Sequence, residues 1–345
     1  MKKTVKVLTI FLAILGGGVV GLTVLAGYLN SPVSTHGEGE EEFSIFKGES
    51  VSAIADRLEQ KGLIRSADFL VWLSRWKGTE KQYRVGHYRI PRGKSTLFVH
   101  DLLVKGAQAL YRVTIPEGWT LTRIARMLEA KGIVSASEFL SASKQEEILK
   151  KYEIPTSSVE GYLFPETYYF PKDFPAIRVI ETMVDTFFQR LSTIVQEKPL
   201  PTGKNLLDRV ILASIIEREY RDPEEAPMIA SVFYNRLKIR MPLGSCATVE
   251  YVLTEELGKP HPDVLTYEDL EVPSPYNTYK HSGLPPGPIC NPGVIALRAA
   301  FYPADTDYRY FVLKDPEAGR HHFSKTLQEH MQAKVVYLKK IQPGS

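Results

Sequence analysis

The segment Asn205–Tyr220 constrains the fold of this 345-residue chain more than any other segment. Between Val210 and Ile216 the only polar residue is Ser214. A helix that is apolar on every side has no face to present to water, so it lies buried among other elements. We therefore expect this segment to form a helix at the centre of a domain.

The same helix ends in a glutamate that continues its buried face. At helical spacing, one stripe of the helix carries Leu206, Val210, Ala213 and Glu217. A buried carboxyl group loses hydration, which raises its pKa and favours the neutral form that a general acid needs near neutral pH. The alternative is that Glu217 starts the solvated end of the helix and pairs with Arg218 or Arg221.

Composition and charge are those of an ordinary globular protein. Hydrophobic residues make up 43% and charged residues 24% of the chain, and its length suits roughly two or three domains. Lys2, Lys3 and Lys6 account for the formal net charge of +3. Because the rest of the chain is neutral, we expect no nucleic-acid partner.

The N-terminal region predicts a membrane anchor. Residues 7–29 are uncharged and mostly apolar, which is long enough for a span of about 20 residues. The lysines in residues 1–6 predict a short cytoplasmic tail, with everything after the span on the periplasmic or extracellular face of the cytoplasmic membrane. A cleaved signal peptide is the alternative, although its apolar core would be about 7–15 residues long. Residues 30–42 are polar and Gly- and Glu-rich, as in a flexible tether.

An internal repeat follows the tether. Residues 43–70 return as residues 113–140, with Gly48 matching Gly118. Each copy predicts a strand, a glycine turn, an amphipathic helix and a glycine stop. A period this long indicates two βα modules and not a solenoid.

The first copy resembles the opening of a LysM module over Gly48–Ala55, and the LysM family binds glycans that contain N-acetylglucosamine. The alternative is a purely structural repeat, because a fold does not imply a function. We expect a LysM-like subdomain at 43–110, a second βα repeat at 111–156 and a mainly helical α+β domain at 157–345.

The C-terminal region predicts further helices and two turn-rich loops. Residues 157–171 are rich in aromatic residues and proline and are expected to be irregular. We expect a strand at 308–313, helices at 176–191, 223–239 and 326–341, and loops that can form a cleft at 242–251 and 273–293.

Several kinds of catalytic site have no support in the sequence. There is no HExxH motif, no phosphate-binding loop and no GxSxG elbow, and His321 and His322 are adjacent. We therefore expect no metal and no cofactor. Cys246 and Cys290 are the only cysteines, and outside the cytoplasm they form a disulfide or remain free, with the pairing held as a hypothesis.

Motifs from nearly the whole chain point to one family. They are Val113–Trp119, Glu160–Tyr168, Leu212–Glu219, Ala230–Leu237, Thr248–Tyr251, Tyr276–Tyr279 and Gly283–Gly287. Together and in this order they resemble the endolytic murein transglycosylases of the YceG-like family. The resemblance implies a membrane-anchored enzyme that cuts the glycan strands of peptidoglycan internally, with residues 157–345 as the catalytic domain.

The resemblance also implies the catalytic residue and the reaction. The family's catalytic glutamate, in an Ala-Ser-Ile-x-Glu motif, falls on Glu217. It would act as the only general acid and base on the bond between N-acetylmuramic acid and N-acetylglucosamine, and the sugar's own C6 hydroxyl would close a 1,6-anhydro end. Residues expected to position the substrate are Asn235, Tyr276, Asn277, Thr278 and Glu166.

Two alternatives to this function remain open. A hydrolytic muramidase would need a second carboxylate, for which the candidates are Glu219, Asp222, Glu250 and Glu166. A non-catalytic scaffold for wall binding or division would use the LysM-like repeat. The expected partners are peptidoglycan glycan strands, the membrane and, by resemblance, peptidoglycan polymerases.

Overall fold

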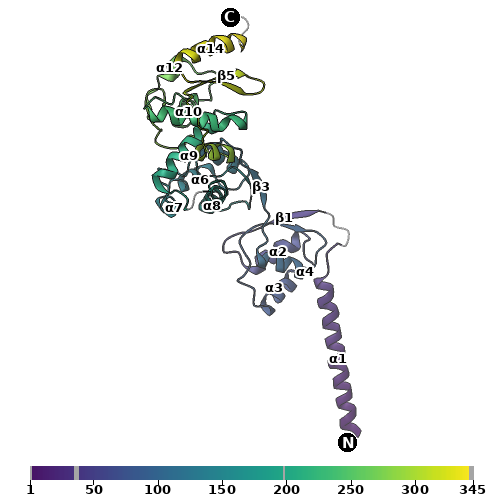
Figure 1. Ribbon diagram of the computed structural model, residues 1–345. Coiled ribbons are helices and arrows are strands. Elements are labelled where there is room, and N and C mark those ends of the chain that lie inside the picture. Colours follow the sequence, from purple (N-terminus) through teal and green to yellow (C-terminus); the bar gives the residue numbers. More distant parts are fainter. Residues whose placement is uncertain (1, 35–38, 197–198, 342–345) are drawn as a thin grey trace. The chain divides into compact units, whose positions relative to one another are not determined.

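The computed structural model describes residues 2–34, 39–196 and 199–341, with side chains described from residue 16 to residue 337 apart from the two gaps. The fold is mixed α+β, as predicted, and its strands pair in two-stranded sheets (Figure 1). The chain divides into two compact units. The first contains residues 1–111 and 171–173, and the second contains residues 112–170 and 174–345.

The chain begins with helix α1, Lys2–Asn30. Within the parts of the chain described here, no helix is both long and apolar enough to cross a membrane. The span expected at 7–29 falls partly outside the described residues, because the side chains before residue 16 are not described. Part of the expected tether, residues 35–38, also lies outside them.

The first unit is built on the first copy of the repeat. Strands β1 (Glu40–Ile45) and β2 (Gly86–Pro91) are antiparallel, with Phe43 opposite Tyr88. They pack with helices α2 (Val51–Gln60), α3 (Ala67–Trp76) and α4 (Thr96–Lys105) around one apolar core. Strand β2 begins at Gly86, and helix α4 ends at Gly106, which has a φ of 74°.

The second copy of the repeat has the same local structure and belongs to the second unit. Strand β3 (Tyr111–Thr114) is followed by helices α5 (Leu121–Ala130) and α6 (Ala136–Ala142). Thr120 caps α5 by accepting a hydrogen bond from Arg123 N. Strand β3 pairs with β4 (Thr167–Phe170), so the stretch 157–171 ends in a strand and is not wholly irregular as predicted.

The remaining elements of the second unit include helices near the predicted 176–191, 223–239 and 326–341 and a strand near the predicted 308–313, whereas part of the loop expected at 242–251 is helical. In chain order, the remaining elements are α7 (Glu146–Lys151), α8 (Ala176–Ile194), α9 (Gly203–Glu217), the 3-10 helix η1 (Pro223–Glu225), α10 (Ala226–Lys238), α11 (Cys246–Tyr251), the π-helical turn η2 (Val252–Glu256), α12 (Tyr267–Leu270), α13 (Val294–Phe301), β5 (Tyr310–Asp315), β6 (Arg320–Ser324) and α14 (Leu327–Ile341). Asp222 caps η1 by accepting a hydrogen bond from Glu224 N.

Helix α9 has the central position that its sequence predicts. Every residue from Val210 to Ile216 is buried, and the helix packs against α10 and α13. The polar exception, Ser214, is satisfied locally because its hydroxyl donates to Ile211 O and accepts from Ile289 N. The buried helix therefore fixes the position of its last residue, Glu217, against the loop that precedes α13.

Candidate active site

Glu217 is the last residue of α9, and its half-buried carboxyl group meets two loops. Gly293 N, just before α13, donates a hydrogen bond of 2.9 Å to Glu217 Oε2. On another side lies the glycine turn of the second repeat, where a methyl group on Gly118 would be 3.6 Å from Glu217 Cγ. The second repeat therefore forms part of the surroundings of Glu217.

The electrostatics of Glu217 suit proton transfer. Burial, together with the nearby Glu117 carboxylate, raises the pKa of Glu217 to about 7, although the Gly293 N–H, the Tyr220 hydroxyl and Arg218 oppose the shift. A carboxyl group with a pKa near 7 can give up a proton and take it back at neutral pH. This behaviour matches the general acid expected from the sequence.

Glu117 is the second carboxyl group at this site, and sequence analysis did not single it out. It is exposed, and a methyl group on Gly293 would lie 1.8 Å from Glu117 Oε1, so this carboxylate occupies the space beside Gly293. The two glutamates thus approach each other across one glycine. Comparison of the two repeats offered one signal for Glu117: the equivalent position in the first copy is Lys47, so the two copies differ in charge there.

Asn291 holds the turn that carries Glu117. Gly118 N donates to Asn291 O at 2.9 Å, and Asn291 N donates to Trp119 O at 2.9 Å. The Asn291 side chain donates to Trp119 O at 3.0 Å and to Glu160 Oε1 at 2.9 Å. Three of these four hydrogen bonds join the second repeat to the loop that binds Glu217, and the fourth joins that loop to Glu160.

Glu160 completes this junction from inside the core. Its oxygens accept from Leu121 N, the first residue of α5, at 2.8 and 3.1 Å. Burial raises the pKa of Glu160 to about 8, despite the opposing hydrogen bonds. Its contacts are those of a structural group that fastens α5 to the rest of the unit.

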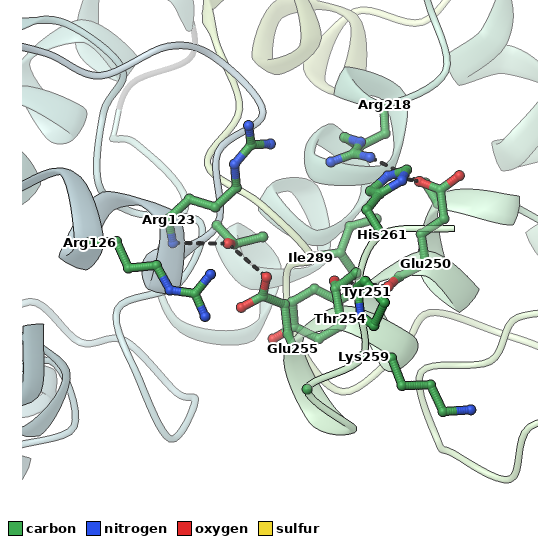
Figure 2. A pocket seen from close by; sticks show the side chains of 14 residues that line it. Arg123, Arg126, Arg218, Glu250, Tyr251, Thr254, Glu255, Lys259, His261 and Ile289 are labelled. Atoms are coloured by element: carbon green, nitrogen blue, oxygen red, sulfur yellow. Dashed lines mark hydrogen bonds and ion pairs between the residues drawn. The ribbon is translucent and has the colours of Figure 1, made fainter. Parts of the chain in front are cut away.

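A cleft of about 510 Å³ is lined by Arg218, the residue after Glu217, although Glu217 itself is not part of its lining (Figure 2). Arg218 lines it and pairs with Glu250 at 2.9 Å, and His261 lies 3.5 Å from the same carboxylate. Thr120 donates to Glu255 at 3.0 Å, so a residue of the second repeat is tied to the wall formed by η2. The cleft lies between α5, the α11–η2 segment and residues 258–261.

A second cavity of about 510 Å³ shares two wall residues, Tyr251 and Glu255, with the cleft. It contains Tyr276, one of the predicted substrate-binding residues, whose ring lies 5.0 Å from that of Tyr251. The buried Glu160 also lines it. Tyr276 is thus the predicted binding residue that the structure places in a cavity next to the Glu217 cleft.

The contacts of three other predicted binding residues favour structural roles. Asn277 is 0% exposed, and its amide donates to Leu270 O and Val272 O. Thr278 is buried and accepts from Ser245 N. Asn235 donates to Thr306 O and Tyr308 O. These side chains hold loops together, and their roles toward a substrate stay predictions.

The four carboxylates considered for a hydrolase have other partners. Glu166 pairs with Arg190, and Asp222 pairs with Arg320. Glu219 accepts from the Ser245 hydroxyl, and burial raises its pKa. Glu250 lines the cleft and is bound to Arg218. Among the described residues, none of these four carboxylates is hydrogen-bonded to Glu217 or shares an ion pair with it.

The hypothesis of a disulfide between Cys246 and Cys290 is wrong, because both cysteines are free. Cys290 is buried and donates to Ser214 O at 3.2 Å, whereas Cys246 is exposed and lies 3.1 Å from the Tyr279 hydroxyl. Among the residues with described positions, no group of three or more His, Cys, Asp or Glu is arranged to hold a metal ion.

Comparison with known proteins gives a consistent set of relatives. The model of the YceG-like family matches residues 43–335. The endolytic murein transglycosylase of Bacillus subtilis strain 168 is 33% identical over 339 residues, covering 93% of this chain and 91% of that protein. The endolytic murein transglycosylase of Streptococcus pneumoniae serotype 2 strain D39 is 28% identical over 93% of this chain and 62% of its own length.

A solved structure agrees with these relatives. The crystal structure of a YceG-like protein from Listeria monocytogenes, at 33% identity, covers 86% of this chain and 99% of its own, with a TM-score of 0.56. The family resemblance expected from the motifs is thereby confirmed.

Proposed function

Because this chain belongs to the YceG-like family, we propose that it is an endolytic lytic transglycosylase of peptidoglycan, with Glu217 as its single general acid and base. The observation that carries this proposal is the raised pKa of Glu217 next to a cleft. Burial and Glu117 hold its pKa at about 7, and a cleft begins at the next residue, Arg218. A single group of this kind suffices when the nucleophile belongs to the substrate.

The reaction runs in two proton transfers. Protonated Glu217 donates to the glycosidic oxygen, the bond from that oxygen to C1 of N-acetylmuramic acid breaks, and positive charge develops at C1. The C6 hydroxyl oxygen of the same sugar then bonds to C1, and ionised Glu217 takes the hydroxyl proton. The strand ends in a 1,6-anhydro sugar, Glu217 recovers its proton, and no water is consumed.

Glu117 has two consequences for this scheme. Its negative charge keeps Glu217 protonated at a higher pH, and the same charge stabilises the cation that develops at C1. Its position across Gly293 also supports one alternative, hydrolysis, because a muramidase needs a second carboxylate near the acid. The two functions differ in their products, which either carry anhydro ends or reducing ends.

Location and partners are proposed on the sequence alone. The charge-free run at 7–29 with lysines before it supports a single-pass anchor in the cytoplasmic membrane and a catalytic unit on its outer side. There the enzyme would meet glycan strands as polymerases release them. Extraction of the full chain from membranes by carbonate at high pH would overturn the anchor.

The test is an end-group assay with the full chain in mild detergent. Wild type and Glu217→Gln are incubated with uncrosslinked glycan strands, and the products are analysed by mass spectrometry. Internal fragments with anhydro ends that only the wild type produces support the proposal. If a folded Glu217→Gln variant cleaves at the wild-type rate, Glu217 is not the acid; if neither protein cleaves, the scaffold alternative is favoured.

A further inference from the structure

The cleft beside Glu217 is positively charged, although the chain beyond its first six residues is neutral. The charged residues in its lining are Arg123, Arg126, Arg218, Lys259, Glu250 and Glu255. With His261 neutral, the cleft has two more positive than negative charges. A neutral sugar needs no such excess, so the lining points to an anionic ligand.

Two of these cations have neither an ion pair nor an aromatic ring as partner. Arg218 is bound to Glu250, and Arg123 lies over the Trp119 ring at 5.0 Å. Arg126, on α5, and Lys259, after η2, are exposed and form no ion pair within the described part of the chain, although the charge of Lys259 helps to lower the pKa of Asp269. Figure 2 shows them on different walls of the cleft, with Glu255 between them and Glu250 beside Arg218 and His261. They are therefore available to a ligand that enters the cleft.

We propose that this cleft binds the carboxylates on the lactyl-peptide branch of muramic acid while the strand is held at Glu217. The inference rests on the proposed function and deepens it. The glycan backbone of peptidoglycan is uncharged, and its acidic groups sit on this branch at C3 of the very sugar whose C1 reacts. A guanidinium and an ammonium from two walls can hold a carboxylate between them.

The position of the cleft fits this role. It begins at Arg218, directly after the acid, and extends along α5 past Thr120, which is three residues from Glu117. A branch from a sugar held at Glu217 would therefore be close to Arg218, in the cleft that Arg126 and Lys259 also line. The enzyme would then prefer strands that still carry acidic branches over neutral ones.

The test compares two double variants on matched substrates. In Arg126→Gln/Lys259→Gln both unpaired cations are removed from the cleft. The control, Lys131→Gln/Lys238→Gln, removes two exposed positive charges at the ends of α5 and α10, outside the cleft. Full-length proteins with matching melting temperatures are assayed for kcat/KM on native strands, on strands with amidated carboxylates, and on strands whose peptides were removed to leave the lactyl carboxylate.

The wild type should cleave native strands about five-fold faster than amidated ones, and the cleft variant should lose this preference while the control keeps it. If the cleft variant still has a lower kcat/KM than the wild type on peptide-free strands, the contact is assigned to the lactyl carboxylate. If the two proteins have equal kcat/KM on these strands, the contact is assigned to the peptide. The preference should also weaken in high salt.

Equal rates of wild type and cleft variant on native strands would overturn the carboxylate site while leaving the proposed function intact. The carboxylate site would also be overturned if the control variant lost the preference for native strands as the cleft variant does. The overall positive charge of the protein surface would then explain the preference. Failure of the wild type to cleave any strand would instead overturn the proposed function itself.

Discussion

Glu117 and Glu217 approach each other across Gly293, whose N–H donates to Glu217 while the Glu117 carboxylate fills the space beside its Cα. The two residues are 100 positions apart and come from different parts of the unit, the turn of the second repeat and the end of α9. Their proximity has a measurable effect, because the charge of Glu117 raises the pKa of Glu217.

Replacing Glu117 by Gln should shift the pH profile of the enzyme. Without the neighbouring negative charge, the ionised form of Glu217 is less unfavourable, so the pKa of Glu217 falls and activity is lost at a lower pH. The measurement is kcat/KM against pH. Glu138→Gln removes an exposed acid of α6 from the same repeat and should leave the profile in place; an identical shift in both variants would deny Glu117 a specific effect.

The wild-type enzyme should lose activity as pH rises through about 7. The pKa of Glu217 is about 7, and the acid must be protonated when the strand binds, so kcat/KM should fall about ten-fold per pH unit above it. A profile that stays flat from pH 6 to 9 would mean that another group donates the proton.

Glu160 should make the protein less stable as pH rises. Burial raises its pKa from 4.5 to about 8, so between these values the folded state keeps a proton that the unfolded state has lost. The free energy of unfolding therefore falls as pH increases from about 4.5 to 8. Glu217 acts in the same direction, so the comparison is between wild type and Glu160→Gln by urea unfolding at pH 5 and pH 8.

Glu160→Gln should weaken this pH dependence and cost about 1 kcal/mol or less at pH 5, because an amide oxygen still accepts from Leu121 N. Glu160→Ala should cost about 2–4 kcal/mol, since it leaves Leu121 N and the Asn291 amide without their partner. Equal pH dependence in wild type and Glu160→Gln would show that Glu160 is ionised in the folded protein.

Gly161→Ala should destabilise the second unit for two reasons. Gly161 has a φ of 86°, and a methyl group there would lie 2.5 Å from Pro288 Cβ and Cγ. Strain and overlap together should cost roughly 2–4 kcal/mol. Gly203→Ala is the control, because Gly203 also has a positive φ, 55°, but has open space beside it, so only about 1 kcal/mol is expected. If the two variants lost similar amounts of stability in thermal melts, overlap with Pro288 would not contribute to the effect of Gly161→Ala.

The sequence predicted what depends on local pattern. Burial of α9 follows from the absence of polar residues between Val210 and Ile216, and the end of α4 follows from Gly106. The position of Glu117 could not be predicted in this way. It depends on hydrogen bonds to Asn291, which is distant in sequence, and a single exposed glutamate in a turn has no periodicity to mark it.

The turn-rich loops were harder to interpret for a related reason. Asn277 and Thr278 lie in a stretch with the composition of a cleft loop, but their side chains are buried and bind neighbouring backbone. Composition indicates that a polar side chain needs a partner without indicating whether that partner is a ligand or the chain itself. The cleft is lined by residues of both loops that were expected to form one, among them Glu250 and Ile289, but its cations come from α5, from the residue after α9 and from residue 259, which no single motif connects.

The most direct test of the central claim is cleavage of purified strands in ¹⁸O-labelled water, with mass analysis of the new ends directly after borohydride treatment. A single acid and base acting with the sugar's own C6 hydroxyl predicts ends that contain no label and resist reduction, all of them absent with Glu217→Gln. New ends that carry ¹⁸O and are reduced by borohydride would show that water is the nucleophile, and would contradict the account.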